Sequence, residues 1–141
     1  MNKTLCLLVD SQKIFLSQRD GKWGGLEEEI KENEEATEGA KRNLWEELGI
    51  QVKAIDLKGI INFEYPEENV EVYIFKVSDY NGSIIENKGQ WFDVLEIPFE
   101  QMRPVDLYWL PLFLKDKNFK GRFVFTGRND IINHKLEVLN D

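Results

Sequence analysis

The chain has 141 residues, of which 42% are hydrophobic and 31% are charged. These proportions are ordinary for a soluble globular protein with one core, so we expect a single domain over residues 1–141. The formal net charge of −8 argues against duplex nucleic acid as a partner, because such binding depends on clustered Lys and Arg side chains. The single cysteine, Cys6, cannot form a disulfide within the chain, and the apolar run at residues 5–9 is too short for a membrane span or a secretory signal. The sequence therefore predicts a cytoplasmic protein that does not contact a membrane.

The segments along the chain predict a mixed α/β fold. Runs rich in Leu, Val, Ile and Phe indicate strands at residues 3–9, 13–18, 55–65, 70–77, 91–94, 119–125 and 131–138. One helix is expected from about residue 35 to residue 48, where Gly49 would end it. A second is expected over about residues 105–114, directly after Pro104.

The first predicted helix carries an acidic edge beside an apolar stripe. The stripe recurs every four residues and would pack on the sheet: Ala36, Ala40, Leu44 and Leu48. Asn43, Glu46 and Glu47 emerge together next to it. Two adjacent carboxylates at the edge of a buried face need a counter-charge, which a divalent cation such as Mg²⁺ would provide. The alternative is a solvated acidic face, which is the commoner arrangement for a glutamate pair taken alone.

The residues around this pair form a recognisable motif. Glu34 precedes Arg42 by eight positions, and residues 42–50 read R-N-L-W-E-E-L-G-I. The pattern resembles the end of the Nudix box, G-x5-E-x7-R-E-U-x-E-E-x-G-U with U aliphatic. Residues 97–112 and the F-x-G-x-F-x-F-x-G run at 119–127 resemble the 8-oxo-dGTP diphosphatase branch of that family, as do residues 4–16, 59–63 and 70–75. The resemblance covers nearly the whole chain.

Membership of that family would imply an α/β/α sandwich with a mixed sheet and a metal-dependent hydrolase. Its substrate would be a nucleoside di- or triphosphate or a related diphosphate-linked compound, and the chain would be a monomer or homodimer. By motif, Glu46 and Glu47 would hold Mg²⁺, with Mn²⁺ as a substitute, while water attacks phosphorus. Arg42 would orient the glutamates through Glu34 or Glu46, although a surface pair with a glutamate on the same helix fits the spacing equally well.

The same resemblance implies a set of substrate-binding residues. Phe63 and Trp109 fit ordinary core aromatics at least as well, and His134 is expected to be structural. The expected lining residues are Thr4, Arg19, Trp23, Phe63, Asp106 and Trp109.

The chain departs from the motif where chemistry is most demanding. Asn43 replaces a glutamate and cannot accept a proton near neutral pH, so we expect reduced activity. Glu86 could substitute only if the alignment contains a gap, and a solvated loop glutamate fits that position better. Aligned without gaps from Trp23, two glycines of the motif become glutamates at positions 27 and 28, which would strain or reshape the loop. The alternative is that the glycines at positions 24 and 25 are the functional ones, followed by an insertion.

Two functions stay open at this point. The base-reading residues of the branch are partly lost, because Gly24 replaces an asparagine and Arg103 and Val105 replace a tryptophan and an aspartate. A hydrolase with altered base preference fits these changes. The alternative is a catalytically silent module that binds a nucleotide or a partner protein.

Overall fold

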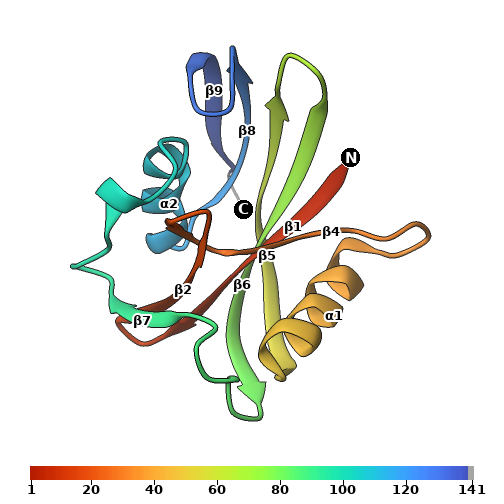
Figure 1. Cartoon of the computed structure of the whole chain (residues 1–141), viewed down its shortest axis with the longest axis vertical. Coiled ribbons are helices and arrows are strands. Elements are labelled where there is room, and N and C mark those ends of the chain that lie inside the picture. The colour runs from red at the N-terminus through yellow and green to blue at the C-terminus, as the bar shows by residue number, and fades with distance from the viewer. Residues whose placement is uncertain (140–141) are drawn as a thin grey trace.

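A curved mixed sheet forms the middle of the fold in the computed structural model, which describes residues 1–139 (Figure 1). The strand order is β3-β2-β1-β6-β5-β8-β9, with β4 pairing β1 and β7 pairing β2. The pairs β1–β6 and β5–β8 are parallel and the others are antiparallel. The strands are β1 (Asn2–Asp10), β2 (Lys13–Arg19), β3 (Lys22–Gly24), β4 (Leu26–Glu29), β5 (Gln51–Glu64), β6 (Asn69–Asn81), β7 (Gln90–Asp93), β8 (Asn118–Phe125) and β9 (Ile131–Leu139).

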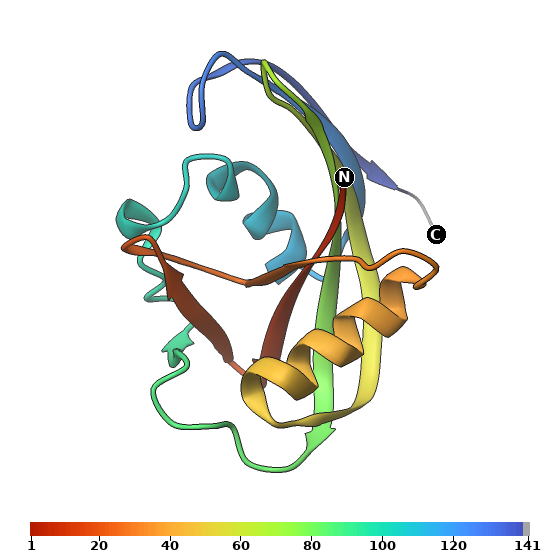
Figure 2. The same ribbon diagram turned by 45° about the vertical axis from the view of Figure 1, so that its right-hand side comes forward.

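One helix covers each face of the sheet (Figure 2). Helix α1 (Ala36–Leu48) packs on one face, and α2 (Asp106–Leu114) packs on the other after a short 3₁₀ turn, η1 (Phe99–Gln101). The expected apolar stripe is buried, since Ala40, Leu44 and Leu48 are each 0% exposed. The α/β/α sandwich with a mixed sheet is therefore confirmed. None of the helices in the described part of the chain is long and apolar enough to cross a membrane.

The ends of α1 agree with the local sequence. The carboxylate of Glu38 accepts a hydrogen bond from the backbone N–H of Glu35 at 3.0 Å, which satisfies a donor just before the helix. At the other end Gly49 adopts a left-handed conformation with φ of 71° and its N–H donates to the carbonyl of Trp45. The predicted helix over residues 35–48 is confirmed to within one residue.

Strand β1 changes partner partway along its length. Its C-terminal residues Leu8–Asp10 pair with β2, whereas Lys3–Cys6 pair with β4. The link between β3 and β4 passes so close to β1 that a Cβ on Gly25 would lie 2.4 Å from the Leu5 side chain. Only glycine fits this crossing, and its reason is close approach rather than a positive φ.

Of the two outcomes expected for Glu27 and Glu28, strain in the loop is not found. Glu27 and Glu28 lie in the extended strand β4, and neither has a positive φ. Strands β3 and β4 were not expected from the sequence. Strand β3 is only three residues long and pairs with β2, and β4 is rich in glutamate, which is depleted in strands, so it depends on pairing with the buried strand β1.

Candidate active site

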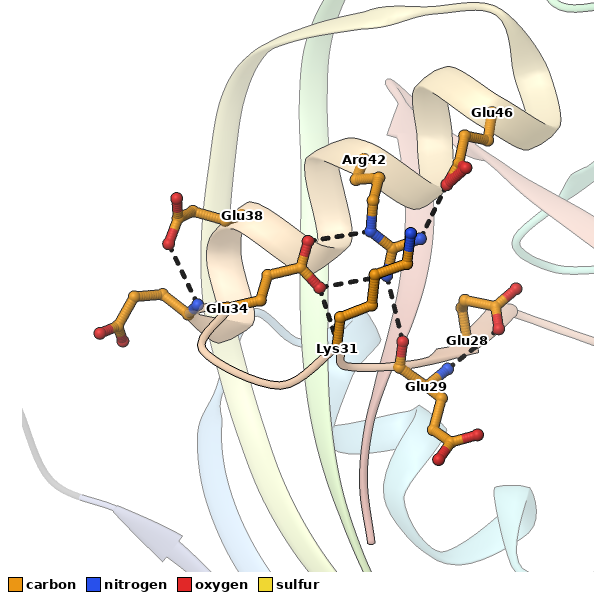
Figure 3. A network of polar contacts seen from close by, with 8 residues as sticks. Glu28, Glu29, Lys31, Glu34, Glu38, Arg42 and Glu46 are labelled. Atoms are coloured by element: carbon orange, nitrogen blue, oxygen red, sulfur yellow. Dashed lines mark hydrogen bonds and ion pairs between the residues drawn. The ribbon is translucent and has the colours of Figure 1, made fainter.

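Arg42 braces α1 against the segment that precedes it (Figure 3). Its guanidinium donates two hydrogen bonds to the Glu34 carboxylate, at 2.9 and 3.1 Å, and one to Glu46 at 2.7 Å. A fourth, at 3.1 Å, goes to the backbone carbonyl of Glu29 at the end of β4. These contacts lower the pKa of Glu34 and raise that of Arg42, chiefly through the hydrogen bonds between them. Both partners expected from the motif, Glu34 and Glu46, are thus held by one side chain.

The Glu34 carboxylate is held in place by further contacts besides those from Arg42. It also accepts a hydrogen bond from the backbone N–H of Lys31 at 3.0 Å. A Cβ on Gly39 would lie 3.1 Å from one of its oxygens, so the absence of a side chain there leaves room for the carboxylate against the helix. The loop before α1 is therefore tied to the helix at a defined distance from β4.

A small pocket of about 140 Å³ opens beside α1, at the point along β1 where its pairing partner changes from β2 to β4. Its polar character distinguishes it from a gap in the core. Arg19 lies on its β2 side and donates a hydrogen bond to the backbone carbonyl of Glu27 at 2.9 Å. The lining residues are Ser17, Gln18, Arg19, Gly25, Leu26, Glu27, Glu28, Asn43 and Glu47.

Helix α1 contributes Asn43 and Glu47 to this pocket. Asn43 is only 2% exposed, and its amide nitrogen has no hydrogen-bond partner. Glu47 is half exposed, and its nearest cation is Lys88 at 4.0 Å, in the loop that follows β6. Glu86 lies in the same loop, exposed to solvent and outside the pocket lining.

The pocket offers oxygen donors of the kind that Mg²⁺ and Mn²⁺ prefer, and this suits a divalent cation. Within residues 1–139 no three His, Cys, Asp or Glu side chains are already gathered around one point. Metal binding would therefore have to draw carboxylates together, and the amide nitrogen of Asn43, which has no partner, shows that a hydrogen-bond acceptor is missing at this point.

A second group of expected site residues lies on the α2 face. Trp23 packs edge-on against Phe92, while Phe63 and Trp109 belong to the apolar core under α2. Asp106 is 2% exposed, and burial raises the pKa of its carboxyl to about 6 although Arg103 acts in the opposite direction.

This face also holds unsatisfied polar atoms. One oxygen of Asp106 is buried without a hydrogen-bond partner. The indole N–H of Trp109 makes no hydrogen bond of ordinary geometry, but it lies close enough to the Asp106 carboxylate to lower the pKa of that group. Gly24 lies beside them, since a Cβ there would come within 3.9 Å of the other oxygen of Asp106. Buried donors and acceptors without partners are the groups that a polar ligand would satisfy.

Glu27 and Arg103 form an ion pair between β4 and the turn before α2. Arg103 donates a hydrogen bond to the Glu27 carboxylate at 3.0 Å, and Lys3 lies 3.5 Å from it. Both side chains stand where the branch has other residues, so the two changes compensate each other in charge. The two changes lie 76 positions apart in the sequence, and only the strand pairing of β4 brings them together.

The remaining expected residues are placed differently. Thr4 precedes Cys6 by two positions on β1, so its side chain lies on the α1 face and not with Asp106 and Trp109. Burial raises the pKa of the Cys6 thiol to about 12, which leaves it unreactive near neutral pH. His134 stacks on Phe123 with ring centroids 5.5 Å apart.

Comparisons with known proteins agree with this architecture. Residues 2–113 match the family model described as the NUDIX domain. The chain is 36% identical to a Danio rerio protein named oxidized purine nucleoside triphosphate hydrolase, over 98% of this chain and 95% of that protein. The Mus musculus protein of the same name is 34% identical over 97% and 94%. The crystal structure of a MutT protein from Bacillus halodurans matches with a TM-score of 0.85 and 27% identity, over 96% of this chain and 97% of that one.

A sandwich of this topology with an arginine-braced acidic helix beside a polar pocket is a nucleotide-hydrolase architecture, and the chain belongs to the Nudix family. It is a Nudix hydrolase that lies near the oxidized purine nucleoside triphosphate hydrolases. Nudix hydrolases generally use divalent metals, and hydrolysis of a nucleoside diphosphate linkage is the activity of the family.

Proposed function

We propose that the chain hydrolyses a purine nucleoside triphosphate at a diphosphate linkage, with Mg²⁺ or Mn²⁺ as the cofactor. The observation that carries the proposal is the pocket beside α1, which brings Arg19, Asn43 and Glu47 together while the Arg42 contacts hold the helix. The names of the relatives from Danio rerio and Mus musculus support a purine nucleotide as the substrate class.

Each side chain has a role that follows from its position. Glu47 lines the pocket and would supply carboxylate oxygens to the cation. Glu46 precedes it on α1 but lies outside the pocket lining and pairs with Arg42, so it would reach the cation only by giving up that pair. The cation would offset negative charge on the phosphoryl oxygens and lower the pKa of the attacking water. Arg19 would bind a phosphate oxygen, because it is the positively charged side chain among the pocket-lining residues. Arg42 and Glu34 would position the carboxylates without touching substrate.

The base would occupy the α2 face. Trp23 offers an aromatic surface there, and buried atoms of Asp106 and Trp109 offer one acceptor and one donor. Phe63 would form part of the apolar wall, while Thr4 would act through its backbone because its side chain faces the other way.

The experiment is a screen of nucleoside di- and triphosphates with Mg²⁺ or Mn²⁺, in which pyrophosphate, orthophosphate and nucleoside monophosphate are quantified. We expect metal-dependent release of pyrophosphate and a nucleoside monophosphate from at least one purine triphosphate. Nucleotide binding by calorimetry without any hydrolysis would instead support the silent-module alternative, which the asparagine at position 43 keeps open.

A further inference from the structure

Two departures from the Nudix box meet at one place in the fold. Asn43 on α1 stands where the box has a glutamate, and Glu28 on β4 stands where the ungapped alignment has a glycine. In the sequence these are separate changes. In the structure both residues line the pocket beside α1, together with Glu47. One carboxylate is absent from the helix and one is added on the strand across from it.

Strand pairing explains why Glu28 faces the helix. On β4, Leu26 lies opposite Cys6 of β1, and Glu28 lies opposite Thr4. Leu26 and Cys6 both belong to the core under α1. Side chains two positions apart on a strand share a face, so Glu28 shares the α1 face with Leu26.

The alternation sends Glu27 the other way, where its carboxylate meets Lys3 and Arg103. Glu34 and Glu46 are both paired with Arg42. Glu28 differs from these three glutamates, because within residues 1–139 no Lys or Arg forms an ion pair with it. Its recorded hydrogen bond is to the neighbouring backbone N–H of Glu29, at 3.2 Å.

The amide of Asn43 is the second observation that points to a ligand. It is 2% exposed and its nitrogen has no hydrogen-bond partner, which is unfavourable if nothing binds there. Rotation of the amide exchanges its oxygen and nitrogen, so the same side chain can present an oxygen to a cation. A carboxylate without an ion pair and an amide whose nitrogen has no partner lie in one pocket, and both side chains carry the oxygen atoms that suit a hard divalent cation that keeps several waters.

We infer that Glu28 supplies, from β4, the carboxylate that position 43 lacks on α1. The divalent cation is then held between strand and helix, by Glu28 and Glu47 with the amide oxygen of Asn43. The inference rests on the proposed function for the identity of the ligand. In this Nudix hydrolase, one carboxylate ligand of the metal site would then come from strand β4 instead of helix α1.

The experiment measures Mn²⁺ binding without nucleotide, by calorimetry and by the loss of the free-ion electron paramagnetic resonance signal. Glu28→Gln is expected to weaken Mn²⁺ binding about tenfold or more. Glu32→Gln is the matched control, because it removes the same charge from an exposed position in the same acidic segment and should bind as the wild type does. Glu28→Gln/Asn43→Glu returns a carboxylate to the helix and should restore binding. Thermal unfolding of each variant checks that it is folded.

Three results would overturn the inference: no Mn²⁺ uptake by the wild type, equal affinities for Glu28→Gln and Glu32→Gln, or a loss in Glu28→Gln that Asn43→Glu does not reverse. The proposed function fails separately. If the wild type binds Mn²⁺ through Glu28 but releases no pyrophosphate from any nucleotide, the metal site stands and the assigned reaction does not.

Discussion

Removing Arg42 should destabilise the fold and should do so in a pH-dependent way. Arg42→Ala deletes four hydrogen bonds, of which three go to carboxylate oxygens of Glu34 and Glu46 and one goes to the end of β4. It leaves the Glu34 carboxylate beside α1 with a single backbone donor, from Lys31.

The magnitude follows from how exposed each contact is. The Arg42 and Glu34 side chains are 22% and 15% exposed, so their two-pronged pair is partly shielded and contributes about 2 kcal/mol. Glu46 is 48% exposed, and its pair with Arg42 adds only about 0.3 to 0.5 kcal/mol. We therefore expect Arg42→Ala to lower the free energy of unfolding by about 2 to 3 kcal/mol near pH 7.

The pH dependence has a defined sign. The contacts from Arg42 lower the pKa of Glu34 below its ordinary value of 4.5. Their contribution is therefore complete above pH 4.5 and is lost as the pH falls through the lower folded-state value. The difference in stability between wild type and Arg42→Ala should shrink below that pH.

Denaturant unfolding at pH 7 and at successively lower pH values measures the effect. Lys41→Ala is the matched control, because it removes a positive charge from the adjacent exposed helix position and should change stability by less than about 0.5 kcal/mol. A cost for Arg42→Ala equal to that of Lys41→Ala, or one that does not change with pH, would refute the structural role given to Arg42.

Three further outcomes are expected. Gly25→Ala should lower the free energy of unfolding by about 1 to 3 kcal/mol, because the new Cβ would lie 2.4 Å from the Leu5 side chain. Gly24→Ala is the control in the same unfolding assay and should cost much less, because its Cβ would lie 3.9 Å from the Asp106 carboxylate. Asp106→Asn should gain stability relative to the wild type as the pH rises from 3.8 to about 6. The reason is that the carboxyl of the folded wild type keeps its proton over this range, whereas the carboxyl of the unfolded chain loses it. A stability difference that does not change with pH would show that Asp106 is not buried as described. The value of kcat/KM for 8-oxo-dGTP should exceed that for dGTP by less than about a hundredfold, because Asp106 remains but Gly24 offers no side-chain amide to a base. A larger ratio would mean that other residues recognise the base.

The sequence predicts α1 well because local rules agree there. The stripe that ends at Leu48, the stop at Gly49 and the acidic edge all describe one helix, and the structure bears out its bounds and its buried face. Strand β4 escaped the same reasoning, since Leu-Glu-Glu-Glu has no strand signature of its own and forms a strand only by pairing with β1.

Some contacts of the candidate site are local in sequence and could be predicted, whereas others depend on strand pairing and could not. The motif spacing fixes Arg42 and its partners on one helix and the loop before it, and these contacts lie within the reach of sequence reasoning. The pairing of Glu27 with Arg103, and the meeting of Glu28 with Asn43, depend on a strand register that no local pattern in the sequence specifies.

The metal dependence of the proposed reaction can be measured by phosphorus NMR of a purine nucleoside triphosphate incubated with the chain, first with Mg²⁺ present and then with Mg²⁺ chelated. The wild type should release pyrophosphate and the nucleoside monophosphate only while Mg²⁺ is present, and Glu46→Gln/Glu47→Gln should lose most of that activity. Release that persists after chelation, or in this double variant, would contradict a reaction carried by a divalent cation on the acidic edge of α1.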